Sequence, residues 1–221
     1  MRFKVVCISR TIAAAGESVG EEVAQRLAFR YVDEQIIVRA GELAQVDPKL
    51  VAAAEHRQPL LRRLVDKLAA AAEVAGPLAL GMGLSVPLGP TALGPPTYRA
   101  EADDMRDFIR AAIHEVATAG RAVIVAHAAS MALASMEGVL RVLVTASPEA
   151  RASRLATVQG VGTAEAATAV AASDRERRDY FRKFYGIQEE LPTRYDLVIN
   201  TDVLTPGQAA DIIVSAAQSG A

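Results

Sequence analysis

The chain has 221 residues, enough for one domain with a substantial core, and its 24 basic residues nearly balance 26 acidic ones. Because this balance gives no bulk attraction to nucleic acid or to an anionic membrane, we expect neither as a partner. The single cysteine excludes a disulfide within the chain. The N-terminal region lacks the sustained apolar stretch of a signal peptide, so we expect a cytoplasmic protein.

A strand, a turn of small residues and a helix are predicted near the N-terminus. Residues 5–8 form an apolar run of β-favouring residues, and Val19, Val23 and Leu27 then recur at helical spacing. Cys7 falls inside the apolar run, which favours a core residue over a nucleophile. A strand that turns tightly into a helix directs backbone N–H groups and the positive end of the helix dipole at one place. The predicted geometry is that of a P-loop, which binds phosphate.

The residue types of this turn depart from the usual P-loop motif GxxxxGK[ST], in which glycines allow close backbone approach and a lysine reaches the phosphates. Here the lysine is missing, and residues 13–15 are three alanines. Gly16 is kept, Glu17 places a negative charge beside the expected anion site, and Ser18 is the hydroxyl left to reach Mg²⁺. An ordinary strand–turn–helix of an α/β domain therefore remains an alternative.

The next part of the chain predicts a short strand and then an irregular segment. The strand, at residues 29–33, ends on Asp33, and a helix is expected from about residue 34 to 44. Residues 74–97 contain no charged side chain but five prolines and five glycines, which exclude a membrane helix or a regular core helix. We expect a long mobile loop, for which three roles are open: packing on a partner subunit, covering a substrate cleft, or disorder.

The second half of the chain alternates strands and helices. A helix is predicted over residues 101–119, and strands are predicted at 121–127 and 139–145 with a small-residue helix between them. These elements form a parallel βαβ unit. His127 falls at the carboxyl end of its strand, where open α/β sheets place ligands, although a packed structural role is equally open. A last strand, at residues 195–201, precedes a terminal helix.

The densest charge lies on two helices predicted to begin near residues 147 and 163. Guanidinium groups can fork onto phosphate oxygens and balance the charge that develops on a transferring phosphoryl group. The alternative is a solvated helix surface held by i,i+3 and i,i+4 pairs, such as Asp174 with Arg177 or Arg178. The arginines concerned are Arg151, Arg154, Arg175, Arg177, Arg178 and Arg182.

Five blocks in this order resemble the cytidylate kinase-like family of P-loop nucleoside monophosphate kinases, over nearly the whole chain. Members of that family carry ISRxxGSGGxxIG, YxDxx[IL][IL], VIVGRGA, DxxRxxYY and YDLxINT. The matching segments of this chain are residues 8–20, 31–37, 123–129, 174–181 and 195–201. Because AAAG replaces GSGG and AHA replaces GRG, the chain resembles a divergent member.

The resemblance implies a three-layer α/β fold of the P-loop kinase type, with a parallel sheet, in a single domain spanning residues 1–221. It implies a helical substrate-side insertion at 34–105 and an arginine-bearing lid at 151–190. The implied activity is ATP- and Mg²⁺-dependent phosphoryl transfer to a nucleoside monophosphate or a similar small acceptor, in a protein that could form a homodimer. The alternative is a catalytically silent nucleotide-binding or assembly protein on the same fold.

The resemblance also implies the site residues. Asp33 and His127 would bind the acceptor, and Ser18 would bind Mg²⁺. The catalytic residues would be Arg151, Arg154 and Arg177, which neutralise the transition state, and Asp174, which positions Arg177. The residues expected to bind ATP are Arg10, Ala13, Ala14, Ala15, Gly16, Glu17, Ser18 and Val19.

Overall fold

The computed structural model describes residues 3–33, 109–126 and 128–219. The chain divides into two compact units, the first made of residues 1–31 and 120–221 and the second of residues 32–119. The insertion predicted at 34–105, with its loop at 74–97, lies outside the described residues, and so does His127. In the second unit, residues 109–119 are helical, as predicted.

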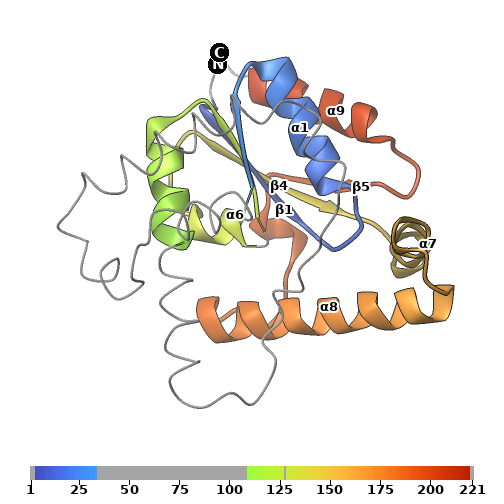
Figure 1. Cartoon of the computed structure of the whole chain (residues 1–221). Helices are drawn as coiled ribbons and strands as arrows, with labels where there is room; N and C mark the ends of the chain where they lie inside the picture. The colour runs from blue at the N-terminus through green and yellow to red at the C-terminus, as the bar shows by residue number, and fades with distance from the viewer. Residues whose placement is uncertain (1–2, 34–108, 127, 220–221) are drawn as a thin grey trace, which may run out of the picture. The chain divides into compact units, whose positions relative to one another are not determined.

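A five-stranded sheet forms the centre of the fold (Figure 1). Its strands lie in the order β2-β3-β1-β4-β5. β1 pairs in parallel with β3 on one side and with β4 on the other, and β4 pairs in parallel with β5. The parallel α/β architecture predicted from the sequence is confirmed. The strands are β1 (Val5–Arg10), β2 (Arg30–Asp33), β3 (Ala122–Val125), β4 (Val139–Thr145) and β5 (Leu197–Asn200).

Parallel strands that are covered on both faces have sequences that are continuously apolar, and β1 and β3 have such sequences. Val6 and Ile8 of β1 face the core shared with Val19 and Val23 of the first helix, and all four are fully buried. Cys7, whose side chain alternates to the other face of β1, is fully buried as well. The prediction that Cys7 is a core residue is confirmed.

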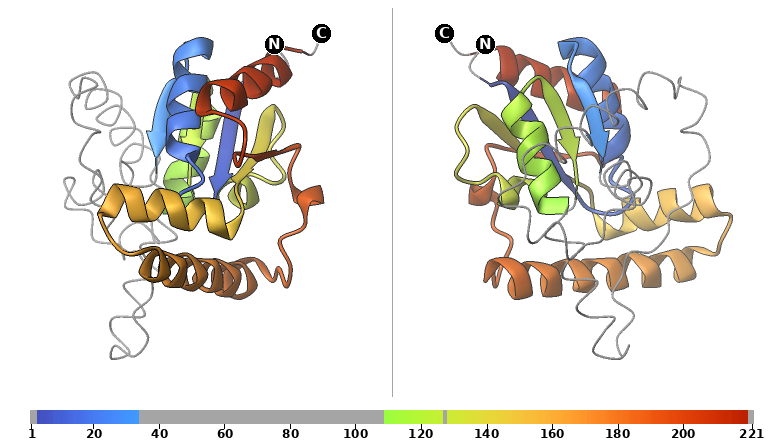
Figure 2. Two further views of the ribbon diagram at one scale, coloured as in Figure 1. Left: turned by 90° about the vertical axis from the view of Figure 1, so that its right-hand side faces the viewer. Right: turned by 60° about the vertical axis from the view of Figure 1, so that its left-hand side comes forward.

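Five of the described α-helices belong to the first unit. α1 and α9 share the core cluster with the sheet and cover one of its faces, while α6 packs against β1. α7 and α8 pack on each other beyond the end at which the strands finish (Figure 2). The helices are α1 (Gly16–Leu27), α6 (Ala129–Ala132), α7 (Pro148–Gln159), α8 (Thr163–Tyr185) and α9 (Pro206–Gln218).

Local capping sets the starts of two of these helices. The Ser147 hydroxyl accepts a hydrogen bond from the N–H of Ala150, and Pro148 occupies the first helical position of α7. Thr205 and Gln208 form a reciprocal capping box at the start of α9. Within the three described stretches, no helix is both long and apolar enough to cross a membrane.

Candidate functional site

In the turn between β1 and α1, the sign of the backbone φ angle alternates from residue to residue. Ala13 and Ala15 have φ angles of 57° and 60°, in the left-handed region, whereas Ala14 between them does not have a positive φ. Alternation of this kind lets successive backbone N–H groups converge on an anion. A left-handed conformation costs a residue with a Cβ roughly 1–2 kcal/mol, so the chain keeps a glycine-type backbone here without glycine.

The first turn of α1 presents backbone N–H groups that have no acceptor within the helix. Ala15 occupies the N-cap position and has no side-chain acceptor, and the first helical hydrogen bond runs from the N–H of Val19 to the Ala15 carbonyl, at 3.0 Å. The N–H groups of Gly16, Glu17 and Ser18 precede it, at the positive end of the helix dipole. The strand–turn–helix expected from the sequence is confirmed, and its geometry suits an anion.

Gly16 is required by a neighbouring side chain. A Cβ at this position would lie 2.6 Å from the Cβ and 2.9 Å from the Cδ of Arg10. Because real Cβ atoms do not approach other carbon atoms so closely, a side chain at residue 16 would displace Arg10 or the turn. From the P-loop motif alone, the expected reason for this glycine is the close approach of a phosphate.

Glu17 forms an ion pair with Arg10. The Nε of Arg10 lies 2.5 Å from the Glu17 carboxylate, and the Arg10 side chain is 16% exposed against 45% for Glu17. The sequence predicted a negative charge beside the anion site. In the structure that charge lies against the Arg10 guanidinium, which brings a cation to a turn that lacks the usual lysine.

Arg151 joins α7 to α8. Its Nη1 and Nη2 donate to the two carboxylate oxygens of Asp174, at 2.8 and 2.7 Å, and its Nε donates to the Ala146 carbonyl, at 3.0 Å. The Arg151 side chain is only 4% exposed. The prediction that Asp174 positions Arg177 is therefore wrong, because the packing of α7 on α8 buries Arg151 against this carboxylate and a buried guanidinium needs a paired anion.

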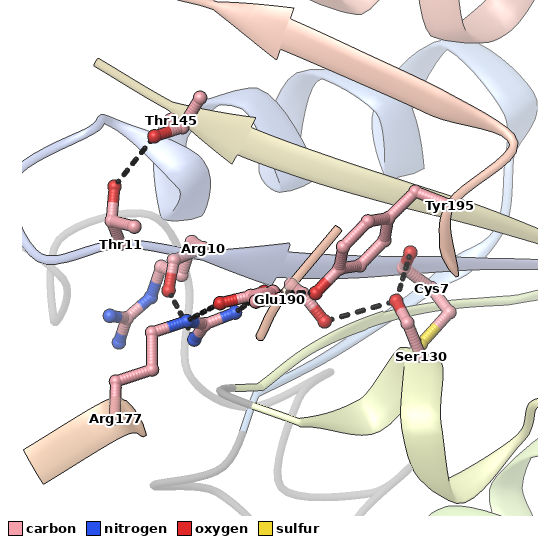
Figure 3. Close-up of polar contacts among 9 residues, drawn as sticks. Cys7, Arg10, Thr11, Ser130, Thr145, Arg177, Glu190 and Tyr195 are labelled. Carbon is pink, nitrogen blue, oxygen red and sulfur yellow. Dashed lines mark hydrogen bonds and ion pairs between the residues drawn. The ribbon is translucent and has the colours of Figure 1, made fainter. Parts of the chain in front are cut away.

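Arg177 pairs instead with Glu190 (Figure 3). Its Nε and Nη2 donate to the Glu190 carboxylate, at 2.7 and 2.6 Å, and its Nη1 donates to the carbonyl of Arg10, at 3.0 Å. The hydroxyl of Tyr195 donates to the same carboxylate. Burial lowers the pKa of Arg177, but the bonded Glu190 carboxylate raises it, and the net direction is upward. Arg177 thus ties α8 to the end of β1.

Glu190 and Tyr195 were not predicted as site residues. Glu190 is an acidic residue at the boundary of the arginine-rich segment, and Tyr195 opens the YDLxINT block. Burial raises the pKa of Tyr195, and the neighbouring Glu190 carboxylate raises it further. A buried arginine needs hydrogen-bond acceptors, and this need points to Glu190 and Tyr195. The sequence does not show that Arg177 is buried, so it does not show that need.

Arg154 contacts the turn through carbonyl groups. Its Nη1 donates to the Ala13 carbonyl, at 3.3 Å, and to the Thr201 hydroxyl, at 3.1 Å, while its Nη2 donates to the Thr201 carbonyl. The Thr201 hydroxyl lies 3.0 Å from the Ala14 carbonyl and 3.2 Å from that of Thr145. Thr201, which ends the YDLxINT block, is not among the site residues predicted from the sequence.

The remaining arginines of α8 lie on its exposed surface. Arg175 and Arg178 are exposed, and exposed Arg182 forms an i,i+3 pair with Asp179, at 2.7 Å. Such pairs contribute little to stability. The solvated-surface alternative describes this face of α8.

The other predicted site residues are placed in less detail. Ser18 is an exposed residue of the first turn of α1, and Asp33 is the last residue of β2. Over residues 3–33, 109–126 and 128–219, no three His, Cys, Asp or Glu side chains gather into a metal-binding group. Mg²⁺ that is bound with nucleotide needs few protein ligands, because phosphate oxygens and waters supply the others. A single Ser18 hydroxyl fits that kind of site.

Three buried side chains, those of Cys7, Ser9 and Ser130, contact one another on the face of β1 opposite to Val6 and Ile8. The Ser9 hydroxyl donates to the Ser130 hydroxyl, at 3.0 Å, and Ser130 contacts the Cys7 carbonyl and sulfur (Figure 3). Burial raises the pKa of Cys7 to about 12. Since the thiolate is the reactive form, full burial and the raised pKa both disfavour Cys7 as a nucleophile.

Comparison with known proteins gives one family match. The model of the cytidylate kinase-like family matches residues 5–203. Cytidylate kinase of Sulfolobus acidocaldarius is 35% identical over 75 residues, a stretch that covers 34% of this chain and 41% of that protein. This chain therefore spans less than half the length of that curated relative.

Solved structures with a similar fold include two proteins matched over nearly their whole length. An uncharacterized protein from Eubacterium ventriosum has a TM-score of 0.57 at 14% identity, with 98% of this chain and 99% of that chain covered. Shikimate kinase from Acinetobacter baumannii, solved in complex with shikimate, has a TM-score of 0.50 at 10% identity, with coverages of 97% and 92%. At these identities the likeness is one of fold, and it agrees with the α/β kinase architecture predicted from the sequence.

Proposed function

This chain belongs to the cytidylate kinase-like family, and we propose that it transfers a phosphoryl group from ATP, with Mg²⁺, to a nucleoside monophosphate or a similar small acceptor. The observation that carries the proposal is the β1–α1 turn. Left-handed Ala13 and Ala15 lead into three backbone N–H groups, those of Gly16, Glu17 and Ser18, that have no helical acceptor. Such groups are the usual ligands of a phosphate at a helix start.

Charge at the turn is compatible with a bound polyphosphate. The Arg10 guanidinium balances Glu17 at 2.5 Å, so the carboxylate adds no uncompensated negative charge. Ser18 offers a hydroxyl from the first helical turn. ATP with Mg²⁺ would supply the transferable phosphoryl group, and the residues of this turn would bind and orient its phosphate oxygens.

A second candidate, the catalytically silent nucleotide-binding protein, is favoured by one observation. Arg151 and Arg177 each pair with a carboxylate, of Asp174 and Glu190 respectively, and are nearly inaccessible to solvent. A role in charge neutralisation requires that a phosphate oxygen replace one of these carboxylates. A protein in which that exchange does not occur would bind nucleotide without transferring phosphate.

Two measurements on the full chain separate these candidates. Calorimetric titration with MgATP tests the turn, and transfer to a panel of nucleoside monophosphates tests the chemistry. The kinase proposal expects binding and transfer, and the silent alternative expects binding alone. Absence of heat at millimolar MgATP would overturn both.

A pair of matched variants assigns any binding to the turn. Ser18→Ala removes an exposed hydroxyl from the first turn of α1, and Ser215→Ala removes one from exposed Ser215 of α9. We expect weaker MgATP binding for Ser18→Ala and unchanged binding for Ser215→Ala. Equal behaviour of the two variants would show that the Ser18 hydroxyl takes no part in MgATP binding.

A further inference from the structure

We propose that Arg154 and Thr201 are positioning residues, which fix the direction of the backbone amides in the β1–α1 turn by holding the carbonyl groups of Ala13 and Ala14. The inference deepens the proposed function and rests on it, because the amides matter only if the turn binds phosphate. It assigns Arg154 a role different from direct neutralisation of the transferring phosphoryl group.

Thr201 is fixed by the sheet before it reaches the turn. Its N–H donates to the Thr145 carbonyl, at 2.8 Å, just beyond the paired ends of β4 and β5. Its side chain is buried, at 2% exposure, although it is polar. The hydroxyl has one proton and lies 3.0 Å from the Ala14 carbonyl, nearer than the 3.2 Å to that of Thr145. A rigid strand end therefore holds the Ala14 carbonyl.

Arg154 completes the arrangement from α7. Its Nη1 is shared between the Ala13 carbonyl and the Thr201 hydroxyl, and its Nη2 donates to the Thr201 carbonyl. Both terminal nitrogens are thus bonded to the turn and to the residue that holds it. Unlike Arg151 and Arg177, which pair with carboxylates, Arg154 has only neutral partners in these bonds.

Because the peptide bond is planar, a contact that holds a carbonyl group also fixes the direction of the N–H group of the next residue. In a trans peptide the C=O and the N–H point in opposite directions. Holding the Ala14 carbonyl toward Thr201 therefore directs the N–H of Ala15 away from it. Holding the Ala13 carbonyl toward Arg154 leaves the N–H of Ala14 to bond the Thr11 carbonyl, at 3.2 Å, which closes the turn just before the amides of Ala15 and of the helix start.

The left-handed alanines explain why such support is needed. Residues in sparsely populated backbone regions keep that conformation only where the surroundings over-determine it. Ala13 and Ala15 are both left-handed, and a glycine would adopt the same φ without the clash of a Cβ. The carbonyl contacts of Arg154 and Thr201 supply the constraint from outside the turn.

The test compares four single variants of the full chain and one double variant, Thr201→Val/Arg154→Met. Thr201→Val removes the hydroxyl at nearly constant volume, and Thr201→Ser keeps it. Arg154→Met removes the guanidinium and keeps an unbranched stem. Thr157→Val is the matched control, since Thr157 is an exposed threonine of α7. The measurements are the Kd of MgATP and of inorganic tripolyphosphate, the kcat and KM for transfer, and hydrogen exchange of the amides of residues 14–18.

We expect Thr201→Val and Arg154→Met each to weaken MgATP and tripolyphosphate binding about tenfold, the loss of roughly one hydrogen bond's contribution. Thr201→Ser and Thr157→Val should stay near the parent affinity. The double variant should be little weaker than either single one, because both residues act on the same turn. Amide exchange at residues 14–18 should accelerate in the two weakened variants.

Two outcomes overturn the proposal. A lower kcat for Arg154→Met, with unchanged Kd and unchanged amide exchange, would make Arg154 a residue that touches the phosphoryl group. Unchanged amide exchange in Thr201→Val would show that the hydroxyl does not hold the turn. If the parent chain binds no MgATP, the proposed function fails, whereas amide exchange still decides whether Arg154 and Thr201 fix the turn.

Discussion

Two hydrogen bonds join the guanidinium of Arg177 to the carboxylate of Glu190, with nitrogen-to-oxygen distances of 2.7 and 2.6 Å. The two side chains are 6% and 18% exposed, so little water screens them. Since Arg177 also donates to the carbonyl of Arg10, the pair fixes α8 to the end of β1.

Arg177→Ala is expected to lower the free energy of unfolding by about 3 kcal/mol, because it leaves the Glu190 carboxylate, only 18% exposed, without its cation. Arg178→Ala is the control: its side chain is exposed on the same helix, and the loss should stay below about 0.5 kcal/mol. Urea unfolding of both variants checks the difference. A double variant Arg177→Ala/Glu190→Gln should recover part of the loss, and no recovery would contradict the assigned pairing.

Glycine substitutions in the turn should have opposite effects at adjacent positions. Ala15→Gly relieves a φ of 60° and is expected to stabilise the protein by about 0.5–1 kcal/mol, the left-handed penalty less the entropic cost of glycine. Ala13→Gly should gain less, because the Ala13 methyl also packs against a small core cluster. Ala14→Gly should destabilise, since Ala14 is fully buried and has no positive φ to relieve. Thermal unfolding of the three variants tests this order.

Gly16→Ala should destabilise the protein by about 1–3 kcal/mol, the usual cost of overpacking, because the new Cβ would lie 2.6 Å from the Arg10 Cβ. Gly162→Ala, at the N-cap of α8, provides a comparison: a Cβ there meets no atom within 4 Å. The free energies of unfolding should differ by more than the measurement error. Similar values for the two variants would show that Arg10 moves aside without cost.

Alkaline pH should weaken the fold through Cys7. Burial raises the pKa of this thiol from 9.0 to about 12, so above pH 9 the unfolded chain releases a proton that the folded chain keeps. The unfolded state then binds fewer protons, and the free energy of unfolding falls with rising pH, by up to about 1.4 kcal/mol per pH unit for this group. Below pH 9 its contribution is fully present. Cys7→Ala should show a flatter decline between pH 9 and 11 in urea unfolding, whatever its stability at pH 7.

The local elements could be predicted from the sequence, because the signals for them are local. The apolar run at residues 5–8 is sufficient for a buried strand, and the hydroxyl followed by proline at Ser147 and at Thr205 is sufficient for the start of a helix. The order of five motif blocks likewise indicated the family that the comparison over residues 5–203 shows. These features depend on neighbours within about one helical turn, or on order along the chain.

The partners of the arginines were decided by the tertiary structure. Arg151 and Asp174 are 23 positions apart, Arg177 and Glu190 are 13 apart, and Arg154 and Thr201 are 47 apart. The i,i+3 rule, which suggested Asp174 with Arg177, describes only neighbours on one exposed helix. Burial changes the outcome, because a guanidinium that loses water needs an acceptor within hydrogen-bonding distance, and tertiary packing decides which acceptor that is. That choice depends on how the helices, the loop after α8 and the end of β5 pack together, and the spacing of charges along the chain does not predict this packing.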